Sequence, residues 1–203
     1  MFAVIFEVQP KPDKWDQYLD LAKQLRPELV QIDGFIDNER FRSLRTEGRL
    51  LSLSIWANEK SVIRWRTHAM HHDVQGKGRF EVFEDYHLRV GEVTFDTAKP
   101  HLPQQRFDST EIGGAKSVSI TEIAPGNDVP VIGHDGVVDA ESYESITTPG
   151  KQLLLVSWRE APAWQPPGRM RHRQVRIIRD YGLRDRREAP QFYPDVARSG
   201  GRG

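Results

Sequence analysis

The fold is decided by residues 51–93, which read LSLSIWANEKSVIRWRTHAMHHDVQGKGRFEVFEDYHLRVGEV. The opening leucines and isoleucine alternate with serines and a tryptophan, and this period of two predicts a half-buried strand at residues 49–57. Asn58 can cap a helix that we expect to run to about Gln75. The two glycines that follow should end this helix before a long strand at residues 80–95. The stretch therefore predicts a strand, a helix and a second strand in succession.

The residues upstream add two strands and another helix. Alternating apolar residues predict a strand at residues 2–8, and apolar residues three and four positions apart predict a helix at residues 15–29. Pro27 should kink this helix or end its regular part. After an Asp-Gly turn, residues 35–43 are expected to form the next strand. The order β-α-β-β-α-β is the ferredoxin-like α+β plan, in which two helices cover one face of a four-stranded antiparallel sheet and the other face needs a partner.

The second half of the chain repeats parts of the first. The sequence DYHLR at residues 85–89 recurs as DYGLR at residues 180–184, and LSIW at residues 53–56 recurs as LVSW at residues 155–158. Prolines and glycines in the segments between these marks argue against long helices there. We therefore expect a helix-poor second copy that keeps four strands, at residues 117–123, 142–147, 152–158 and 173–187. Its sheet should pack on the open sheet face of the first copy.

The composition divides the chain into an intact unit, a linker, a degenerate unit and a tail. Residues 1–97 form the intact ferredoxin-like unit, and the Pro- and Gln-containing residues 98–115 are typical of a linker. The helix-poor copy is expected at residues 116–195. The glycine-rich end, residues 196–203, is expected to be a disordered tail.

The composition also excludes several classes of function. Among 203 residues, 29 Lys and Arg balance 29 Asp and Glu, so no net field attracts nucleic acid or an anionic membrane. The lack of cysteine rules out disulfides, thiolate metal sites and a cysteine nucleophile. The sequence shows neither a membrane-spanning apolar run nor a signal-peptide pattern, so we expect a cytoplasmic protein. One basic run, residues 169–187, has few aromatic residues for base stacking and is interpreted as a solvated strand face.

Residues 51–93 resemble the C-terminal half of an antibiotic biosynthesis monooxygenase domain. The marks are the strand ending in Trp56, then Trp65-Arg66, His68, His71 and Gln75 on the helix, and Tyr86-x-Leu88-Arg89-Val90 on the last strand. The resemblance covers residues 1–97 well and residues 115–195 weakly. Members of this family form α+β barrels by packing two sheets face to face. The resemblance therefore implies that the tandem copies build such a barrel within one chain.

Our first hypothesis is a monooxygenase-like protein that acts on or binds a small aromatic or polyketide-like molecule without a cofactor. The family that the chain resembles includes cofactor-independent oxygenases of aromatic polyketides. Such a reaction needs a pocket for an easily oxidised ring, polar groups that stabilise its anion, and exclusion of water. The candidates are His68 as proton acceptor with Arg66 and Tyr86 beside it, and a lining formed by Trp65, Trp56, Asn38 and Phe83. The aromatic residues equally suit a helix–sheet core, because aromatics at such interfaces usually fill volume.

The second hypothesis is haem binding or degradation through a histidine of the second helix. His71 and His72 follow His68 by three and four residues, so the three rings share one side of a helix and have a spacing that can hold iron. They equally suit a polar, solvent-exposed helix face, and we assign no metal site. The haem-degrading branch of the family has an Asn late in the first strand and a His ten residues after the helix Trp. Phe6 and Gln75 stand at those positions here.

The third hypothesis is a non-catalytic small-ligand or assembly module. The degenerate half would then present its exposed sheet face to another subunit, as in a homodimer. A helix–sheet interface without a cavity of small-ligand size would favour this hypothesis over both enzyme hypotheses.

Overall fold

The structure is a computed structural model that describes residues 1–99, 101–133, 135–194 and 196. The first half of the chain contains β1 (Phe2–Pro10), α1 (Trp15–Leu29), β2 (Phe35–Ser43), β3 (Leu50–Trp56), α2 (Glu59–Thr67), α3 (Ala69–Lys77), the π-helical turn η1 (Gly78–Val82) and β4 (Phe83–Asp96). The second half contains β5 (Ser117–Ile123), β6 (Val137–Ser145), β7 (Gln152–Trp158) and β8 (Arg171–Gly182).

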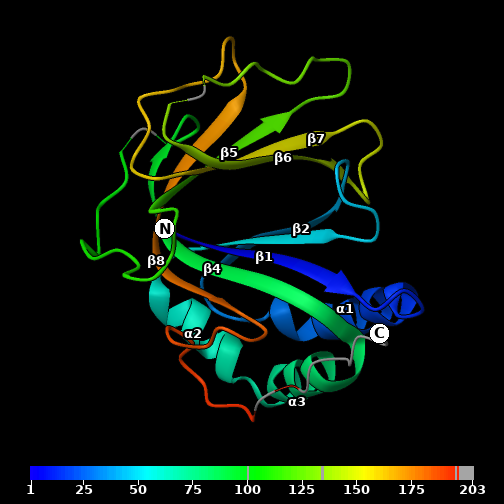
Figure 1. Ribbon diagram of the computed structural model, residues 1–203. Helices are drawn as coiled ribbons and strands as arrows, with labels where there is room; N and C mark the ends of the chain where they lie inside the picture. Colours follow the sequence, from blue (N-terminus) through cyan, green and yellow to red (C-terminus); the bar gives the residue numbers. More distant parts are fainter. Residues whose placement is uncertain (100, 134, 195, 197–203) are drawn as a thin grey trace, which may run out of the picture.

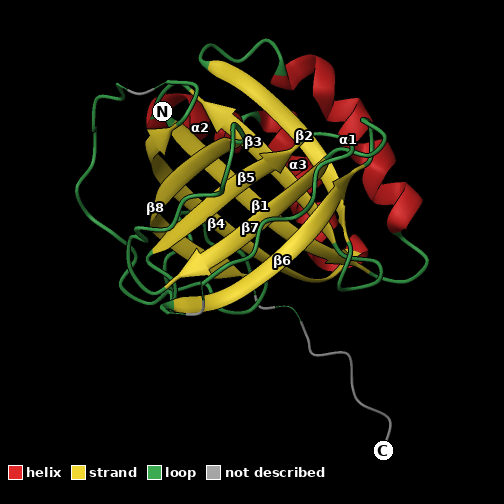
Figure 2. Cartoon of the chain, turned by 90° about the horizontal axis from the view of Figure 1, so that it is seen from above, coloured by secondary structure: helices red, strands yellow, loops and turns green. Residues whose placement is uncertain are grey.

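The strands of the described residues close into an antiparallel barrel (Figures 1 and 2). The order around the barrel is β1-β3-β2-β6-β7-β5-β8-β4. Strands of each half occupy four consecutive positions, and the halves meet where β2 pairs with β6 and where β4 pairs with β8. The α+β class with an antiparallel sheet, expected from the sequence, is confirmed.

The barrel interior is an apolar core to which both halves contribute. Its fully buried members include Ala3, Ile5, Phe41, Leu51, Val118, Ile120, Leu153, Val175 and Ile177. The alternate residues of β1 point outward, where Phe2 and Val8 pack in clusters that contain residues of the helices. The alternation that predicted β1 thus separates two apolar faces, one inside the barrel and one beneath the helices.

All the helices of the described residues lie outside the barrel on the side formed by the first half (Figure 1). The second half has no helix among its described residues. Loops cover the outer face there, since Ile132, Trp164 and Met170 pack on the buried side chains of Leu154 and Val156. Among the residues that the structure describes, a space between helices and sheet is therefore available only on the first half.

The prediction of one continuous second helix, from Asn58 to about Gln75, is wrong: the structure has two helices there, and the second ends later than predicted. Asn58 does cap α2, because its Oδ1 accepts a hydrogen bond from the Ser61 N–H at 3.0 Å. His68, however, has extended backbone angles, φ −63° and ψ 130°, and separates α2 from α3. The chain then stays helical through η1, so β4 begins later than predicted. Gly78 is needed in this turn because a Cβ there would lie 2.5 Å from the Phe83 ring.

Two strands of the second half are also displaced from their predicted ranges. β6 begins five residues earlier, at Val137, because Val137 pairs with Trp158 and β6 runs along the whole of β7. β8 ends earlier than residue 187 because the Gly182 N–H turns back to donate to the Asp185 carbonyl at 2.8 Å.

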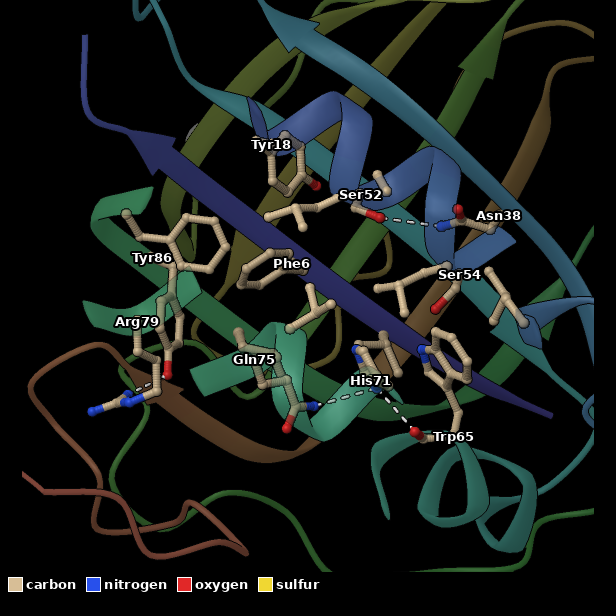
Figure 3. A pocket seen from close by; sticks show the side chains of 18 of the residues that line it. Phe6, Tyr18, Asn38, Ser52, Ser54, Trp65, His71, Gln75, Arg79 and Tyr86 are labelled. Carbon is tan, nitrogen blue, oxygen red and sulfur yellow. Dashed lines mark hydrogen bonds between the residues drawn. The ribbon is translucent and has the colours of Figure 1, made fainter. Parts of the chain in front are cut away.

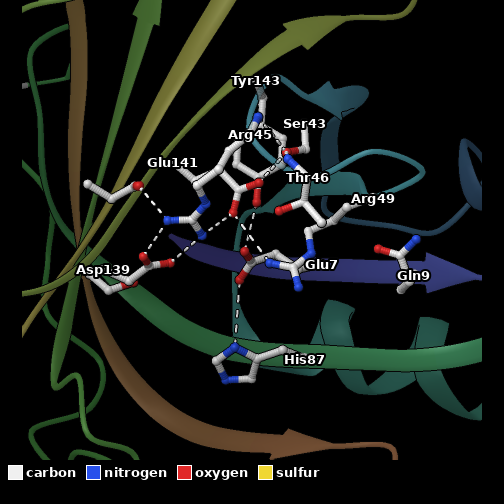
Figure 4. Close-up of polar contacts among 12 residues, drawn as sticks. Glu7, Gln9, Ser43, Arg45, Thr46, Arg49, His87, Asp139, Glu141 and Tyr143 are labelled. Atoms are coloured by element: carbon white, nitrogen blue, oxygen red, sulfur yellow. Dashed lines mark hydrogen bonds and ion pairs between the residues drawn. The ribbon is translucent and has the colours of Figure 1, made fainter.

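A buried polar network joins the two halves at one end of the barrel (Figure 4). Glu7 of β1 accepts hydrogen bonds from Arg89 of β4 at 2.6 Å and from the hydroxyl of Tyr143 of β6 at 2.7 Å. Arg89 also donates to Ser157 of β7 at 2.6 Å. Burial and the nearby Glu7 carboxylate raise the pKa of Tyr143, so its hydroxyl stays a donor. The network satisfies charges that would otherwise be expensive to bury.

The interpretation of the basic run as a solvated strand face is wrong. Arg173 is buried and pairs with Asp96 at 3.1 Å and with Glu122 at 2.7 Å. Arg176 pairs with the buried Glu92 at 3.0 Å. Much of the positive charge of this run is therefore neutralised inside the chain.

The structure describes the expected linker but little of the expected tail. Residues 101–115 contain no helix or strand, yet they pack on the body of the protein, because Thr110 donates to Glu188 at 2.7 Å. The predicted tail, residues 196–203, lies outside the described residues except for Val196. None of the described helices is long and apolar enough to cross a membrane.

Candidate functional site

A cavity of about 180 Å³ lies between the helices and the outer sheet face of the first half (Figure 3). Its surface is mainly apolar, and it is partly open to solvent. The apolar walls come from the sheet and from α1 and include Val4, Phe6, Leu88, Tyr18, Leu21 and Leu25. An engineered cavity of about 150 Å³ accommodates benzene, so the space is large enough for an organic ring.

His71 of α3 lies against Trp65 of α2 at the helical wall of the cavity. The two rings are nearly parallel, at 14°, with centroids 4.2 Å apart. His71 Nδ1 lies 2.9 Å from the Trp65 carbonyl oxygen, which can only accept, so Nδ1 carries the hydrogen and Nε2 keeps a free lone pair. Burial lowers the pKa of His71 to about 4, although the hydrogen bond to Trp65 opposes this effect. His71 is therefore a neutral proton acceptor at physiological pH.

A second polar group lies at the sheet wall. Asn38 of β2 donates from Nδ2 to Ser52 Oγ and to the Leu53 carbonyl, both at 3.1 Å. Its Oδ1 is buried and has no hydrogen-bond partner among the described residues. Asn38 lines the cavity, so an acceptor without a donor is present at this wall.

Further polar groups of the lining come from both halves of the chain. Arg79 of η1 and Tyr86 of β4 line the cavity together with Arg186 and Tyr193, which follow β8. Tyr193 donates to Gln75 Oε1 at 3.1 Å and thereby attaches the C-terminal segment to α3. The cavity thus lies on the first half, and residues of the second half complete its wall.

The structure brings four of the predicted site residues to the cavity and places three elsewhere. Trp65, Asn38, Phe83 and Tyr86 line it. Trp56 is fully buried in the core and does not line the cavity. His68, at the break between α2 and α3, lies outside the cavity and faces Glu28 at 3.6 Å. Arg66 is likewise not among the lining residues.

The helix break explains the misplacement of the histidines. A continuous helix would put His68, His71 and His72 on one side, but the extended His68 rotates α3 relative to α2. As a result only His71 lines the cavity, while His72 is exposed and lies 3.3 Å from the Tyr193 hydroxyl. The described residues contain no group of three metal-binding side chains.

Comparison with known proteins shows the family. The model of the family described as antibiotic biosynthesis monooxygenase matches residues 1–77. The jasmonate monooxygenase ABM of Pyricularia oryzae is 43% identical over an alignment 215 residues long. The alignment covers 97% of this chain and 100% of that protein. This chain belongs to the antibiotic biosynthesis monooxygenase family. The family resemblance seen in residues 51–93 is thereby confirmed.

Two further comparisons concern a shorter relative and a solved structure of similar fold. The uncharacterized protein YqjZ of Bacillus subtilis is 29% identical over 92 residues, 45% of this chain and 78% of that protein. A solved structure of an aldoxime dehydratase in complex with butyraldoxime has a TM-score of 0.52 at 10% identity, covering 87% of this chain and 79% of that one. The second likeness concerns the fold alone.

Haem, one cofactor implied by the monooxygenase family resemblance, has a single candidate ligand at this cavity. Of the three candidate ligands only His71 lines it, with its ring stacked on Trp65. The geometry therefore does not support the haem hypothesis.

The buried histidines predict a pH dependence of stability. His172 is fully buried, and burial lowers its pKa to about 4, as it does for His71. The unfolded chain binds more protons than the folded chain between about pH 6.5 and pH 4, so the free energy of unfolding should fall as the pH drops through this window. The loss should be on the order of a few kcal/mol.

Urea unfolding at pH 7.5, 6.5 and 5.5 measures this effect. His172→Gln and His71→Gln should each make the free energy of unfolding less dependent on pH. A native chain whose stability is unchanged between pH 7.5 and 5.5 would contradict the assignment of both rings as buried and neutral.

Proposed function

We propose that the protein is a monooxygenase that oxidises a small, ring-containing molecule of the jasmonate kind in the cavity beneath α1 and α3, without a bound cofactor. The observation that carries the proposal is the neutral His71, which presents a free Nε2 lone pair at the wall of a mainly apolar cavity. The full-length similarity to a jasmonate monooxygenase supports this substrate class.

The cavity supplies what oxygenation without a cofactor requires. A carbon next to a ketone or an aromatic ring bears an acidic hydrogen, and His71 Nε2 accepts this proton as a general base. The carbanion then reacts with dioxygen to give a hydroperoxide. Loss of water from a hydroperoxide on a former methylene group leaves a ketone, so one oxygen atom enters the product and the other leaves as water. The substrate supplies the electrons, and no external reductant is needed.

The walls support the proton transfer. The apolar side chains of Phe6 and Leu88 exclude water from the carbanion, and the Asn38 amide group is polar enough to orient a hydroxyl or amide donor of the substrate. Trp65 holds the His71 ring in a fixed orientation through the stacking contact and the carbonyl hydrogen bond. Such positioning is what an active base needs.

We also infer that the second half derives from a copy of the first. Trp56 and Trp158 end β3 and β7, and each lies opposite the start of the neighbouring strand, at Phe2 and Ser117 respectively. The order β2-β3-β1-β4 of the first half corresponds to β6-β7-β5-β8 of the second. The degenerate copy replaces the partner subunit of a two-chain barrel and contributes residues to the cavity.

Incubation of the purified protein with jasmonate under ¹⁸O₂ tests the proposed function. We expect a product that contains one ¹⁸O atom, formed without added metal, flavin or haem, and an equal amount of labelled water. Anthrone, an aromatic polyketide-type substrate, serves as the second probe because it has an acidic methylene group. Lack of a labelled product from both compounds, or oxidation that starts only when haemin or flavin is added, would refute the proposal.

A further inference from the structure

Two arginines and a tyrosine converge at one end of the cavity. Arg79 and Arg186 each donate from Nη1 to the Tyr86 hydroxyl at 2.7 Å. Arg79 is only 3% exposed, so one of the two positive charges is almost completely removed from water. The guanidinium carbons lie 5.0 and 5.6 Å from the centre of the Tyr193 ring, which partly offsets the positive charge.

Within the described residues, neither of these two arginines forms an ion pair. Their neighbours differ in this respect, because Arg184 pairs with Asp85 and Arg187 pairs with Asp185. The other hydrogen bonds of the two guanidinium groups go to the carbonyls of Leu183 and Gln191. Two cations held by one hydroxyl repel each other, and burial strengthens the repulsion. An anion at this end of the cavity would remove the repulsion.

Several hydrogen-bond donors remain unused at the same place. The Nε atoms of Arg79 and Arg186 are buried and lack a partner among the described residues. Because the Tyr86 oxygen already accepts two hydrogen bonds, its own hydrogen is still available to donate. A carboxylate accepts up to four hydrogen bonds and is the group that arginine recognises best.

We propose that Arg79, Arg186 and Tyr86 bind the carboxylate of an organic acid whose apolar ring occupies the rest of the cavity. The inference rests on the proposed function only for the identity of the cavity as the substrate site. It adds that these three residues recognise the acid group of the substrate, and that the neutral methyl ester of the same acid is a poor ligand.

The arrangement also fixes the direction of the substrate. Figure 3 places Arg79 and Tyr86 at one side of the cavity and Trp65 at the other, with Phe6 between them. An acid held at the arginines therefore extends across Phe6 towards Trp65 and the stacked His71. The carboxylate is kept away from the base, so the proton is removed from a carbon in the body of the molecule.

The second half of the chain is required for this subsite. Arg186 lies beyond the end of β8, and its Nη2 donates to the carbonyl of Gln191 in the C-terminal segment, 2.9 Å away. Tyr193 lies two residues further along the same segment. The degenerate half thus supplies one of the two cations, which gives it a role in specificity beyond closing the barrel.

Calorimetric binding under argon tests the inference without any oxygenation. The probes are jasmonate, phenylacetate and naphthylacetate, each paired with its methyl ester. The chain should bind at least one acid about tenfold or more tightly than the ester. Arg79→Gln and Arg186→Gln should each weaken acid binding about ten- to hundredfold, which corresponds to the loss of a charged hydrogen bond, and should weaken ester binding only a few-fold.

Arg184→Gln is the matched control, because Arg184 lies two residues before Arg186, pairs with Asp85 and does not line the cavity. It should change the ratio of acid to ester affinity much less than the other two substitutions. Arg79→Lys keeps the charge and replaces Arg79→Gln if the latter does not fold. Equal affinity for acids and esters, equal losses for both ligand types, no binding of any probe, or a larger effect of Arg184→Gln would overturn the inference. A chain that binds the acids but oxidises none of them would instead refute the proposed function alone.

Discussion

Replacement of Arg89 by methionine should lower the free energy of unfolding by about 3–5 kcal/mol, the usual effect of removing one partner of a buried ion pair. Arg89 is only 3% exposed and donates to the buried Glu7 and to Ser157. Methionine fills a similar volume but leaves the Glu7 carboxylate without an arginine, with a hydrogen bond from Tyr143 and with His87 Nδ1 3.7 Å away. Chemical unfolding followed by circular dichroism measures the effect.

The double variant Glu7→Gln/Arg89→Met separates the loss of charge balance from the loss of packing. It should be more stable than Arg89→Met alone, because no unpaired charge is buried. Arg64→Met is the control at the surface, since Arg64 pairs with the exposed Asp33 and should contribute at most about 1 kcal/mol. An Arg89→Met variant as stable as Arg64→Met would show that the network does not hold the two halves together.

Strands could be predicted from the sequence where apolar and polar residues alternate along a short stretch. The expected ranges 35–43, 117–123 and 152–158 coincide with β2, β5 and β7. Alternation depends only on neighbouring residues and on the burial of one face, so the pattern suffices. The break at His68 could not be predicted in this way, because it depends on how the Trp65 and His71 rings pack after the chain has folded.

The site was only partly predictable for the same reason. Tyr86 and Asn38 are site candidates on predicted strands, and both line the cavity. Arg79 was overlooked because it lies in a segment expected to be a turn and strand, although it is buried in η1. Arg186 belongs to the basic run at residues 169–187. Which arginines of this run find an acidic partner depends on the folded structure, so a local pattern does not single out Arg186. The position of the C-terminal segment on α3 is a tertiary contact, and a local pattern does not contain it either.

Replacement of His71 by phenylalanine should reduce kcat by about a hundred- to ten-thousandfold, the usual contribution of a general base. Phenylalanine preserves the ring that stacks on Trp65 and removes both nitrogens, so the fold and substrate binding should change little. His68→Phe and His72→Phe are matched controls, because both residues lie outside the cavity. They should retain most of the activity. If His68→Phe abolishes turnover and His71→Phe does not, the base is the residue that the sequence alone suggested.

The pH dependence of kcat/KM identifies the base independently of substitution. It reports the ionisation of the free enzyme, and a base must be unprotonated to act. Since burial lowers the pKa of His71 to about 4, the rate should be retained at pH 5.5 and fall only as the pH approaches 4. An ordinary exposed histidine would lose its activity near pH 6.5 instead. The stability of the chain decreases over the same range, so the rates must be measured within seconds of a jump from pH 7.5. A decline centred near pH 6.5 in such jumps would exclude His71 and direct attention to another proton acceptor.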